Sequence, residues 1–298
     1  MPSLRAQLVN LASRFLVKRV LNKPELSLAD TRRAMGARAT MPALLPRGLR
    51  VTASDEPHLP GEWQRPAASA RGAVILFLHG GGYVGGSPKT HRSFSSWLGH
   101  EAQVPVFSLR YRLAPEHPFP AGLDDAVLAA RTLAGRGLRV VIAGDSAGAG
   151  LAVATALRLR DEGESFVRGL VLVCPLTDLT DTSESLRTNE RSEPLLGLRH
   201  RVRMFQSYAA NTPLVHPLLS PVYAALAGLP PMIVEASRIE VLWDDARRFV
   251  DAAQHAGCDV EFHPHDGLSH DWQLMVPLTP ESVTSTRRLG AWIASRLR

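Results

Sequence analysis

The sequence is poor in cysteine. Two of its 298 residues are cysteines, Cys174 and Cys258. Small domains that depend on disulfide bonds have a much higher proportion of cysteine, because their cores are too small to hold the fold without covalent links. A chain of this length can bury about three quarters of the surface that its unfolded form exposes, so it needs no such links. We therefore expect a reduced protein of the kind found in a bacterial cytoplasm.

Long apolar runs are also missing. None reaches the roughly 18 residues expected of a membrane-spanning helix, so we expect no stable membrane insertion. Within residues 1–23, apolar residues at helical spacing alternate with basic ones, unlike the continuous apolar segment of a signal peptide. This spacing predicts a helix packed on the body of the protein, and adsorption to an anionic membrane surface is the alternative. The apolar positions are Leu4, Leu8, Leu11 and Phe15, and the basic ones are Arg5, Arg14, Lys18 and Arg19.

Lysine is scarce as well. The chain has three lysines, so nearly all of its 34 basic residues are arginines, and the net charge is +6. The basic residues form no run and lie in no motif of a nucleic-acid-binding module. We therefore expect no binding to DNA or RNA, and the charge bears on solubility and on weak steering of anions.

Strand-like runs alternate with helix-like segments from residue 72 onward. This alternation predicts an α/β protein with a mostly parallel sheet covered by helices on both faces. Residues 42–71, rich in proline, glycine and alanine, are expected to form a loop or weak strands. The predicted strands are 72–78, 105–111, 139–143, 170–173, 231–236 and 260–263, and the predicted helices are 123–133, 147–161, 242–256 and 281–297.

One segment, residues 177–229, breaks this rhythm with polar turns, a helix-like piece over 199–210 and no buried strand. We expect an insertion that joins the N-terminal helices as a helical cap over the carboxyl ends of the strands, where open parallel sheets carry their active sites. The predicted division is N-terminal cap helices at 1–45, a catalytic domain at 46–176 and 223–298, and a cap insertion at 177–222.

A serine lies in a tight turn between a predicted strand and a predicted helix. The run GDSAG at 144–148 directly follows the strand 139–143. Glycines at these positions allow the sharp turn that exposes a serine hydroxyl, as in a nucleophile elbow. Ser146 is therefore the predicted nucleophile, and a helix-capping serine in a glycine-rich turn is the alternative.

Three consecutive glycines follow another predicted strand, in the run HGGGY at 79–83. Their N–H groups can converge on the oxyanion of an acyl-transfer reaction, where each donor lowers the barrier by about 2.7–4 kcal/mol. Gly80, Gly82 and Gly85 also fit the spacing of a dinucleotide-binding loop. Against that alternative, Pro88 stands where a phosphate-binding helix would continue, and the next strand ends in arginines without an acidic residue for a ribose.

A serine nucleophile needs a general base that is oriented by an acid. In α/β-hydrolases the chain order is serine, acid, histidine. His270 follows the last predicted strand and is the predicted base, with His263 and His265 as competitors. The run HPHD at 263–266 could also supply metal ligands, but no second ligand cluster is visible, so we expect no metal.

The predicted acid is Glu240, which lies in the loop just past the strand 231–236. Asp244 is the alternative, although it falls in the following helix, where an acidic residue also suits the positive end of the helix dipole.

These motifs together resemble the hormone-sensitive-lipase-like family of bacterial esterases, also called family IV. Further similar segments are YRLAPEHPFPA at 111–121, PLLSP at 217–221 and GLPP at 228–231. The resemblance runs from about residue 72 to the end and implies an α/β-hydrolase fold with a helical cap. At the acid position much of the family has Asp-Pro-Leu, whereas Glu240 stands in Glu-Val-Leu, which resembles a subgroup that uses glutamate.

The resemblance also implies roles for individual residues. Ser146 would be the nucleophile and His270 the base, and the N–H groups of Gly81, Gly82 and Ala147 would form the oxyanion hole. We therefore expect a serine carboxylesterase that hydrolyses short-chain acyl esters through an acyl-enzyme, without cofactor or metal.

The expected pocket is small and apolar, and it takes a small-molecule ester. Its candidate wall residues are Tyr83, Tyr208, Trp243 and Trp272. Two alternatives stay open: a related hydrolase of amides, thioesters or carbamates, which shares the chemistry, and a non-catalytic small-molecule receptor on the same fold. We expect a cytoplasmic location, and the exposed sheet edges together with the dimers common in the family allow a homodimer.

Overall fold

The structure is a computed structural model that describes residues 1–23, 26–37, 42–197 and 199–297. In these residues one eight-stranded sheet has the order β1-β2-β4-β3-β5-β6-β7-β8. Strands β3 to β8 run parallel, and only the β1–β2 hairpin at one edge is antiparallel to its neighbours. The predicted α/β-hydrolase architecture is thereby confirmed. The parallel strands are β3 (Ala73–Leu78), β4 (Val106–Leu109), β5 (Arg139–Asp145), β6 (Val167–Val173), β7 (Met232–Ser237) and β8 (Val260–His265).

The segment 42–71, which we expected to be a loop or weak strands, contains two strands. They are β1 (Arg50–Glu56) and β2 (Leu59–Arg65). Their sequences carry few consecutive apolar residues, because one side of the hairpin faces solvent. The inner side packs on the sheet: Leu59 is fully buried, and the rings of Trp63 and Phe107 meet edge to face at 5.0 Å.

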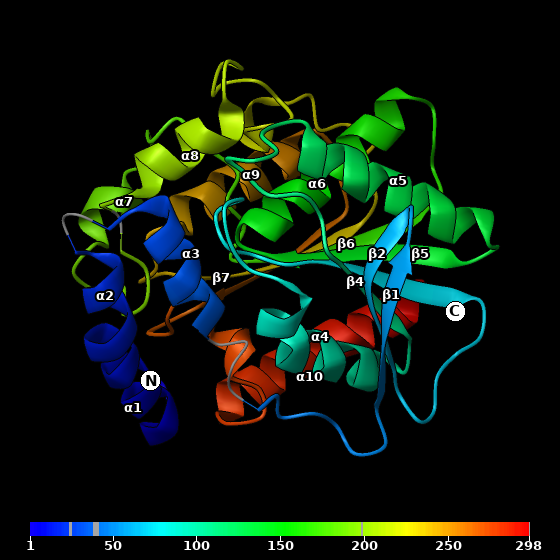
Figure 1. Cartoon of the computed structure of the whole chain (residues 1–298), viewed down its shortest axis with the longest axis horizontal. Coiled ribbons are helices and arrows are strands. Elements are labelled where there is room, and N and C mark those ends of the chain that lie inside the picture. Colours follow the sequence, from blue (N-terminus) through cyan, green and yellow to red (C-terminus); the bar gives the residue numbers. More distant parts are fainter. Residues whose placement is uncertain (24–25, 38–41, 198, 298) are drawn as a thin grey trace.

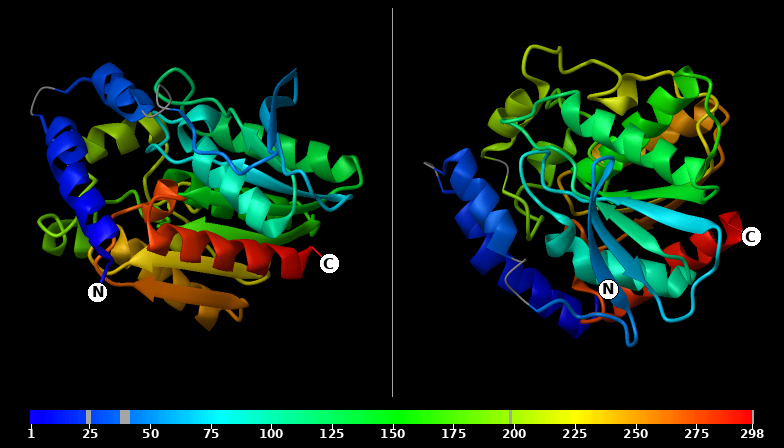
Figure 2. Two further views of the ribbon diagram at one scale, coloured as in Figure 1. Left: turned by 90° about the horizontal axis from the view of Figure 1, so that it is seen from below. Right: turned by 45° about the vertical axis from the view of Figure 1, so that its right-hand side comes forward.

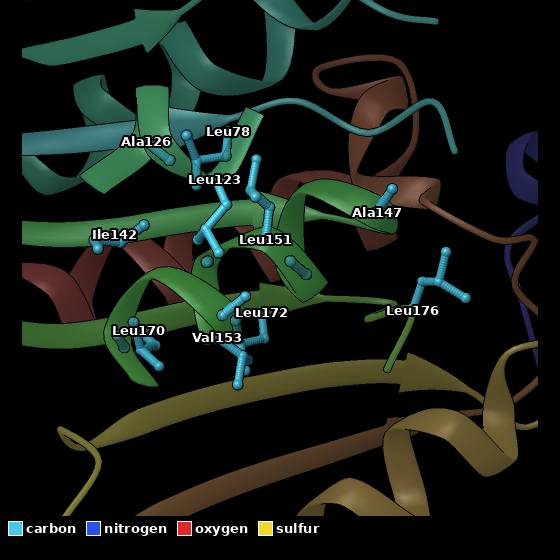
Figure 3. Packing of buried hydrophobic residues seen from close by; sticks show 14 of the residues in the cluster. Leu78, Leu123, Ala126, Ile142, Ala147, Leu151, Val153, Leu170, Leu172 and Leu176 are labelled. Atoms are coloured by element: carbon cyan, nitrogen blue, oxygen red, sulfur yellow. The ribbon is translucent and has the colours of Figure 1, made fainter. Parts of the chain in front are cut away.

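Helices cover both faces of the sheet (Figure 1). On one face lie α5 (Ala121–Gly135), α6 (Ala147–Asp161) and α9 (Trp243–His255), and on the other lie α4 (Pro88–Ala102) and α10 (Pro280–Arg296). Side chains of α5 and α6, such as Leu123 and Leu151, meet Ile142 and Leu172 of the strands (Figure 3). Burying a leucine or isoleucine of this kind contributes about 1.5–3 kcal/mol.

Helix α4 is the main element that the sequence analysis missed. Proline is tolerated in the first turn of a helix, where its missing N–H would have no partner in any case. Ser87 accepts a hydrogen bond from the N–H of Thr90, and the Thr90 hydroxyl receives one from the N–H of Ser87. The expectation that Pro88 interrupts a helix is therefore wrong, because Pro88 begins one.

The predicted N-terminal helix is present, but its apolar side does not pack on the body. It consists of α1 (Leu4–Ser13), a π-helical turn (Arg14–Lys18) and α2 (Arg19–Leu21), followed by α3 (Leu28–Gly36). Ala6 and Ser13 face inward, whereas the leucines and the phenylalanine predicted to pack face outward. Figure 2 shows these helices along one side of the α/β body. In the described part of the chain, no helix has both the length and the apolar character needed to cross a membrane.

The residues between β6 and β7, here called the insertion, form short helices and turns. Its regular elements are α7 (Ser185–Thr188), α8 (Arg201–Ala209) and the short 3₁₀ turn Pro221–Tyr223, and its described residues hold no strand. In Figure 1, α3, α7 and α8 lie together beside one end of the sheet. A second 3₁₀ turn, Trp272–Met275, follows β8.

Candidate active site

A cavity of about 520 Å³ lies where strand ends meet the N-terminal helices and the insertion. Ser146, His270 and the glycine pair Gly81 and Gly82 all line it. The remaining surface is mostly aliphatic or thioether in character. It includes Leu21, Ala34 and Met35 from the N-terminal helices, Leu186, Leu196, Met204 and Phe205 from the insertion, and Val241, Leu242, Leu274 and Val276 from the loops after β7 and β8.

Ser146 occupies a strained turn between β5 and α6. Its backbone has φ +53° and ψ −121°, in a region that L-residues rarely adopt. Its N–H donates to the carbonyl of Val173 at 2.8 Å, and its carbonyl accepts from the N–H of Leu176 at 3.1 Å. A Cβ at Gly148 would lie 2.0 Å from the Leu78 carbonyl oxygen, so the turn requires glycine there. These contacts hold the half-buried Ser146 side chain at the cavity.

The structure joins Glu240 to His270. Oε2 of Glu240 lies 2.5 Å from Nδ1 of His270, and both side chains are buried. The other carboxylate oxygen, Oε1, accepts the N–H of Ser237 at 2.8 Å, which fixes the carboxylate at the end of β7. Asp244 is placed elsewhere: it accepts the N–H of Ser185 at 2.8 Å. Of the two predicted acids, Glu240 is therefore the one that can orient the imidazole ring.

The other ring nitrogen of His270 does not contact the serine hydroxyl through a hydrogen bond in the described structure. Nε2 instead lies 3.0 Å from Oδ2 of Asp271, without the direction of a hydrogen bond. Asp271 has a left-handed backbone, with φ +51°, which turns its carboxylate back toward the preceding ring. In ligand-free active sites the contact between base and nucleophile is often long and shortens when substrate binds. The sequence analysis missed Asp271, although its position directly after the predicted base was a usable signal.

The electrostatic surroundings raise the pKa of His270. Burial by itself lowers this pKa, but the carboxylates of Asp271 and Glu240 outweigh burial and hold the pKa well above its usual value. Burial raises the pKa of Asp271 to about 6, even though the positive charge of His270 acts in the opposite direction. The charge of each group therefore favours the charged form of the other.

A third carboxylate, Glu193 of the insertion, was also missed by the sequence analysis. Its oxygens accept the main-chain N–H of His270 at 3.3 and 3.4 Å and that of Leu195 at 2.6 Å. The side chain is fully buried, and burial raises its pKa to about 7. Glu193 thereby links the insertion directly to the backbone of His270.

The glycine loop has unpaired donors beside Ser146. Gly81 and Gly82 have φ +121° and +61°, which favour glycine. In the described part of the chain, the N–H groups of Gly81, Gly82 and Ala147 have no hydrogen-bond acceptor. Asp145 braces the loop, because its Oδ2 accepts the N–H of Gly80 at 3.2 Å and lies 3.0 Å from Nε2 of His91. Free donors on a braced loop are what an oxyanion site requires.

The competing histidines lie away from the cavity. Nε2 of His263 lies 2.6 Å from Oε1 of Glu261 near the surface of β8. His265 packs against Trp272, with the ring centroids 4.8 Å apart. Neither histidine is among the described residues that line the cavity. Of the three candidate histidines, His270 is therefore the one that lines the cavity together with Ser146.

Three potential metal ligands do lie close together: donor atoms of Cys174, Glu240 and His270 are within 4.8 Å of one another. Ligands about 2 Å from a tetrahedral zinc ion lie roughly 3.3 Å apart. The 2.5 Å contact between Glu240 and His270 is shorter than that and fits a hydrogen bond between the two groups. The donor set therefore suits an acid–base pair better than a metal site.

The four aromatic residues expected as pocket walls lie outside the described cavity lining, so this expectation is corrected. Tyr83 and Tyr208 stack on each other, with centroids 3.8 Å apart, and both are buried. Trp243 stacks on Phe262 at 5.9 Å, and Trp272 is buried against His265. Their large rings stabilise the packing around the site instead of facing the substrate space.

Comparisons with known proteins show to which family the chain belongs. Residues 75–274 match the family model for the alpha/beta hydrolase fold. An acetyl-hydrolase of Streptomyces hygroscopicus is 43% identical over 239 residues, which cover 79% of this chain and 80% of that protein. A crystal structure of an esterase from the bacterial hormone-sensitive lipase family superposes with a TM-score of 0.92 at 34% identity, covering 100% of both chains. The chain belongs to the hormone-sensitive-lipase-like family of esterases.

Two further similar proteins are also named as an esterase and as a hormone-sensitive lipase. An esterase of Acinetobacter venetianus is 36% identical over 226 residues, covering 74% of each chain. A solved hormone-sensitive lipase from a metagenome library has a TM-score of 0.89 at 32% identity and covers 98% of this chain and 97% of its own. The predicted family is thereby confirmed, and the similarity to solved structures covers nearly the whole chain.

Proposed function

We propose that this enzyme hydrolyses carboxylic esters through an acyl-enzyme on Ser146, with His270 as the general base and Glu240 as the acid that orients it. The observation that carries the proposal is the 2.5 Å contact between Glu240 and His270 at the cavity that Ser146 also lines. The N–H groups of Gly81, Gly82 and Ala147 serve as the oxyanion hole.

The reaction proceeds in two steps. Nε2 of His270 takes the hydroxyl proton of Ser146 as Oγ attacks the ester carbonyl, and the oxyanion receives hydrogen bonds from the glycine loop. The C–O bond to the alcohol breaks, and the alcohol leaves with the proton from His270. Water then attacks the acyl-enzyme by the same route and releases the acid. Before the first step, Nε2 of His270 must leave the carboxylate of Asp271 and form a hydrogen bond with the hydroxyl of Ser146.

The substrate class follows from the cavity lining. A cavity of about 520 Å³ with a mostly apolar surface suits an uncharged ester. We propose short acyl chains, and the relative named acetyl-hydrolase supports this choice. The mechanism draws on no cofactor or metal, because the serine, the histidine and the backbone donors supply every group that it needs.

We further propose that residues 1–45 and 177–222 cap a catalytic domain of 46–176 and 223–298. Support comes from Arg32 of α3, whose guanidinium donates to the carbonyls of Val84 and Ala114 at 2.7 Å. The variant Arg32→Ala removes that anchor. Its KM should differ from that of wild type while its melting temperature stays close to the wild-type value, and an unchanged KM would argue against a cap role.

Compartment and assembly are the remaining proposals. Cys174 and Cys258 are unpaired, which suits a reducing cytoplasm. Among the residues that the structure describes, no strand pairs with the outer edge of β1 or of β8, and a homodimer could pair through either edge. Cell fractionation tests the compartment, and light scattering coupled to size exclusion tests the dimer.

The central test compares wild type with Ser146→Ala on p-nitrophenyl esters of increasing chain length. We expect the variant to lose at least about 10⁴-fold in kcat, and the wild type to prefer acetate or butyrate. Ser93→Ala, which changes another serine lining the cavity, should keep most of the activity. A wild type that neither turns over esters nor reacts with a fluorophosphonate would indicate a receptor, and a higher kcat/KM on matched amides or thioesters would indicate the related hydrolase.

A further inference from the structure

The N-terminal helix displays an apolar row to solvent. Leu4, Leu8, Leu11 and Phe15 recur at spacings of four, three and four residues, which places them on one face of a helix. Their relative exposures are 76%, 65%, 54% and 61%. A row of this kind normally packs on the protein interior. We call these four residues the outer apolar stripe.

Three polar contacts attach the helix to the body of the protein. The Ser3 hydroxyl donates to Glu281 at 2.9 Å, and the amide of Asn10 donates to the carbonyl of Gly267 at 2.9 Å. Farther along, Nζ of Lys18 donates to the carbonyl of Glu193 at 2.7 Å. Together with the burial of Ala6 and Ser13 on the inner side, these bonds leave the stripe facing outward.

The charge on this helix is of one sign. Residues 1–24 contain no aspartate or glutamate, and they include three arginines and two lysines. Arg5 and Arg19 are exposed and form no ion pair with any residue that the structure describes. A second copy of the helix would bring like charges together, whereas an anionic surface would attract them. The charge therefore favours lipid over self-association.

Exposed apolar residues also occur in the lining of the cavity. Val17, Leu44 and Leu278 line the cavity and are also 38%, 43% and 51% exposed. Val17 belongs to the π-helical turn that carries Phe15, and Leu278 lies three residues before Glu281, to which Ser3 is bound. The N-terminal helices form the outer layer on this side of the molecule (Figure 2). These exposed residues of the cavity lining include one that shares a helical turn with the stripe and one that lies three residues from a hydrogen-bond partner of its helix.

We propose that the outer apolar stripe docks this protein on an anionic lipid surface, from which uncharged lipophilic esters enter the cavity. The helix lies in the plane of the interface and inserts its apolar side chains among the lipids without crossing them. The docking depends only on the helix, whereas the delivery of esters rests on the proposed function.

The experiment is flotation of the full-length protein with vesicles of phosphatidylcholine containing about 30% phosphatidylglycerol, against phosphatidylcholine alone. We expect binding to the anionic vesicles, weakened by about 0.5 M salt. Leu8→Gln/Phe15→Gln should weaken binding at least about tenfold. The matched control Leu128→Gln/Val215→Gln changes two exposed apolar residues elsewhere, of 40% and 55% exposure, and should bind like wild type.

Arg5→Gln/Arg19→Gln separates charge from apolar contact, because it should remove the preference for anionic vesicles while leaving the stripe intact. The proposal is overturned if wild type does not float with the vesicles, or if the stripe variant floats equally well. It is also overturned if light scattering shows a wild-type dimer that the stripe variant dissociates, since the stripe would then join two copies.

Esterase activity is read separately, on p-nitrophenyl acetate in lipid-free buffer. The stripe variant should match wild type there, which also shows that the variant is folded. If wild type binds vesicles but hydrolyses no ester, the docking stands and the proposed function fails. If wild type and the stripe variant both hydrolyse the ester and neither binds vesicles, the proposed function stands and the docking fails.

Discussion

Oδ2 of Asp271 lies 3.0 Å from Nε2 of His270, the ring nitrogen that should take the proton of Ser146. Glu240 holds the opposite nitrogen, Nδ1, at 2.5 Å. The imidazole therefore has a carboxylate at each nitrogen, inside a buried site where charges interact more strongly than in water. This arrangement stabilises the imidazolium form, which cannot act as a base.

Asp271→Asn should shift the acidic limb of the pH–rate profile to lower pH. Activity requires neutral His270, and the two carboxylates raise its pKa, so wild-type kcat/KM should rise with pH through that elevated value. Removing one carboxylate lowers the pKa, while Glu240, Glu193 and Asp145 remain nearby. The measurement is kcat/KM on p-nitrophenyl acetate from about pH 5 to pH 9.

The control for this change is Asp266→Asn, which removes an exposed carboxylate that pairs with Arg238 at 2.9 Å. Its acidic limb should stay where the wild type has it. If Asp271→Asn leaves the limb in place as well, Asp271 does not govern the protonation of His270.

Glu240→Gln should lower kcat by about 10²–10⁴-fold with little change in KM, because the amide cannot stabilise the imidazolium that forms during attack. Asp244→Asn is the matched control: Asp244 accepts a hydrogen bond from the Ser185 N–H and does not reach His270. It should retain kcat within about threefold. Steady-state kinetics on one ester decides, and a larger loss in the Asp244 variant would reassign the acid.

Glu193→Gln should become more stable relative to wild type as pH rises. The folded protein raises the pKa of Glu193 to about 7, above the value of about 4.3 expected in the unfolded chain. Between these values the folded state binds the extra proton, so the contribution of Glu193 is most favourable at low pH and declines as pH rises to about 7. Glutamine keeps an acceptor for the N–H of His270 and cannot ionise.

Thermal unfolding of both proteins at about pH 5 and pH 8 measures this difference. The change in melting temperature, variant minus wild type, should be more positive at the higher pH. An equal change at both values would mean that Glu193 titrates alike in the folded and unfolded states.

Gly148→Ala should unfold more readily than wild type, by roughly 3 kcal/mol, because its Cβ would lie 2.0 Å from the backbone oxygen of Leu78. Gly135→Ala is the control, since a Cβ there would meet nothing within 4 Å and alanine favours the end of α5. Urea unfolding compares the two. A Gly148 variant as stable as wild type would show that the strand–helix turn can widen.

Some strands and helices could be predicted because a few adjacent residues determine them. The strand before the GDSAG run and the helix after it were predictable because a buried strand, a glycine turn and an alanine-rich helix follow one another without interruption. Helix α4 was not, because its buried side carries Thr90, His91 and Ser95 beside the expected apolar residues. Those polar groups are satisfied by hydrogen bonds with distant residues, such as that from Ser95 to Gln64.

The sequence by itself determined the six parallel strands, the sharp turn at Ser146 and the glycine loop, because each depends on neighbouring residues and their backbone preferences. Only the tertiary structure decided that Glu240 and not Asp244 meets His270, that Glu193 and Asp271 surround it, and that the apolar row of the first helix faces outward. These outcomes depend on burial and on contacts between residues far apart in the chain, which residue type and spacing do not encode.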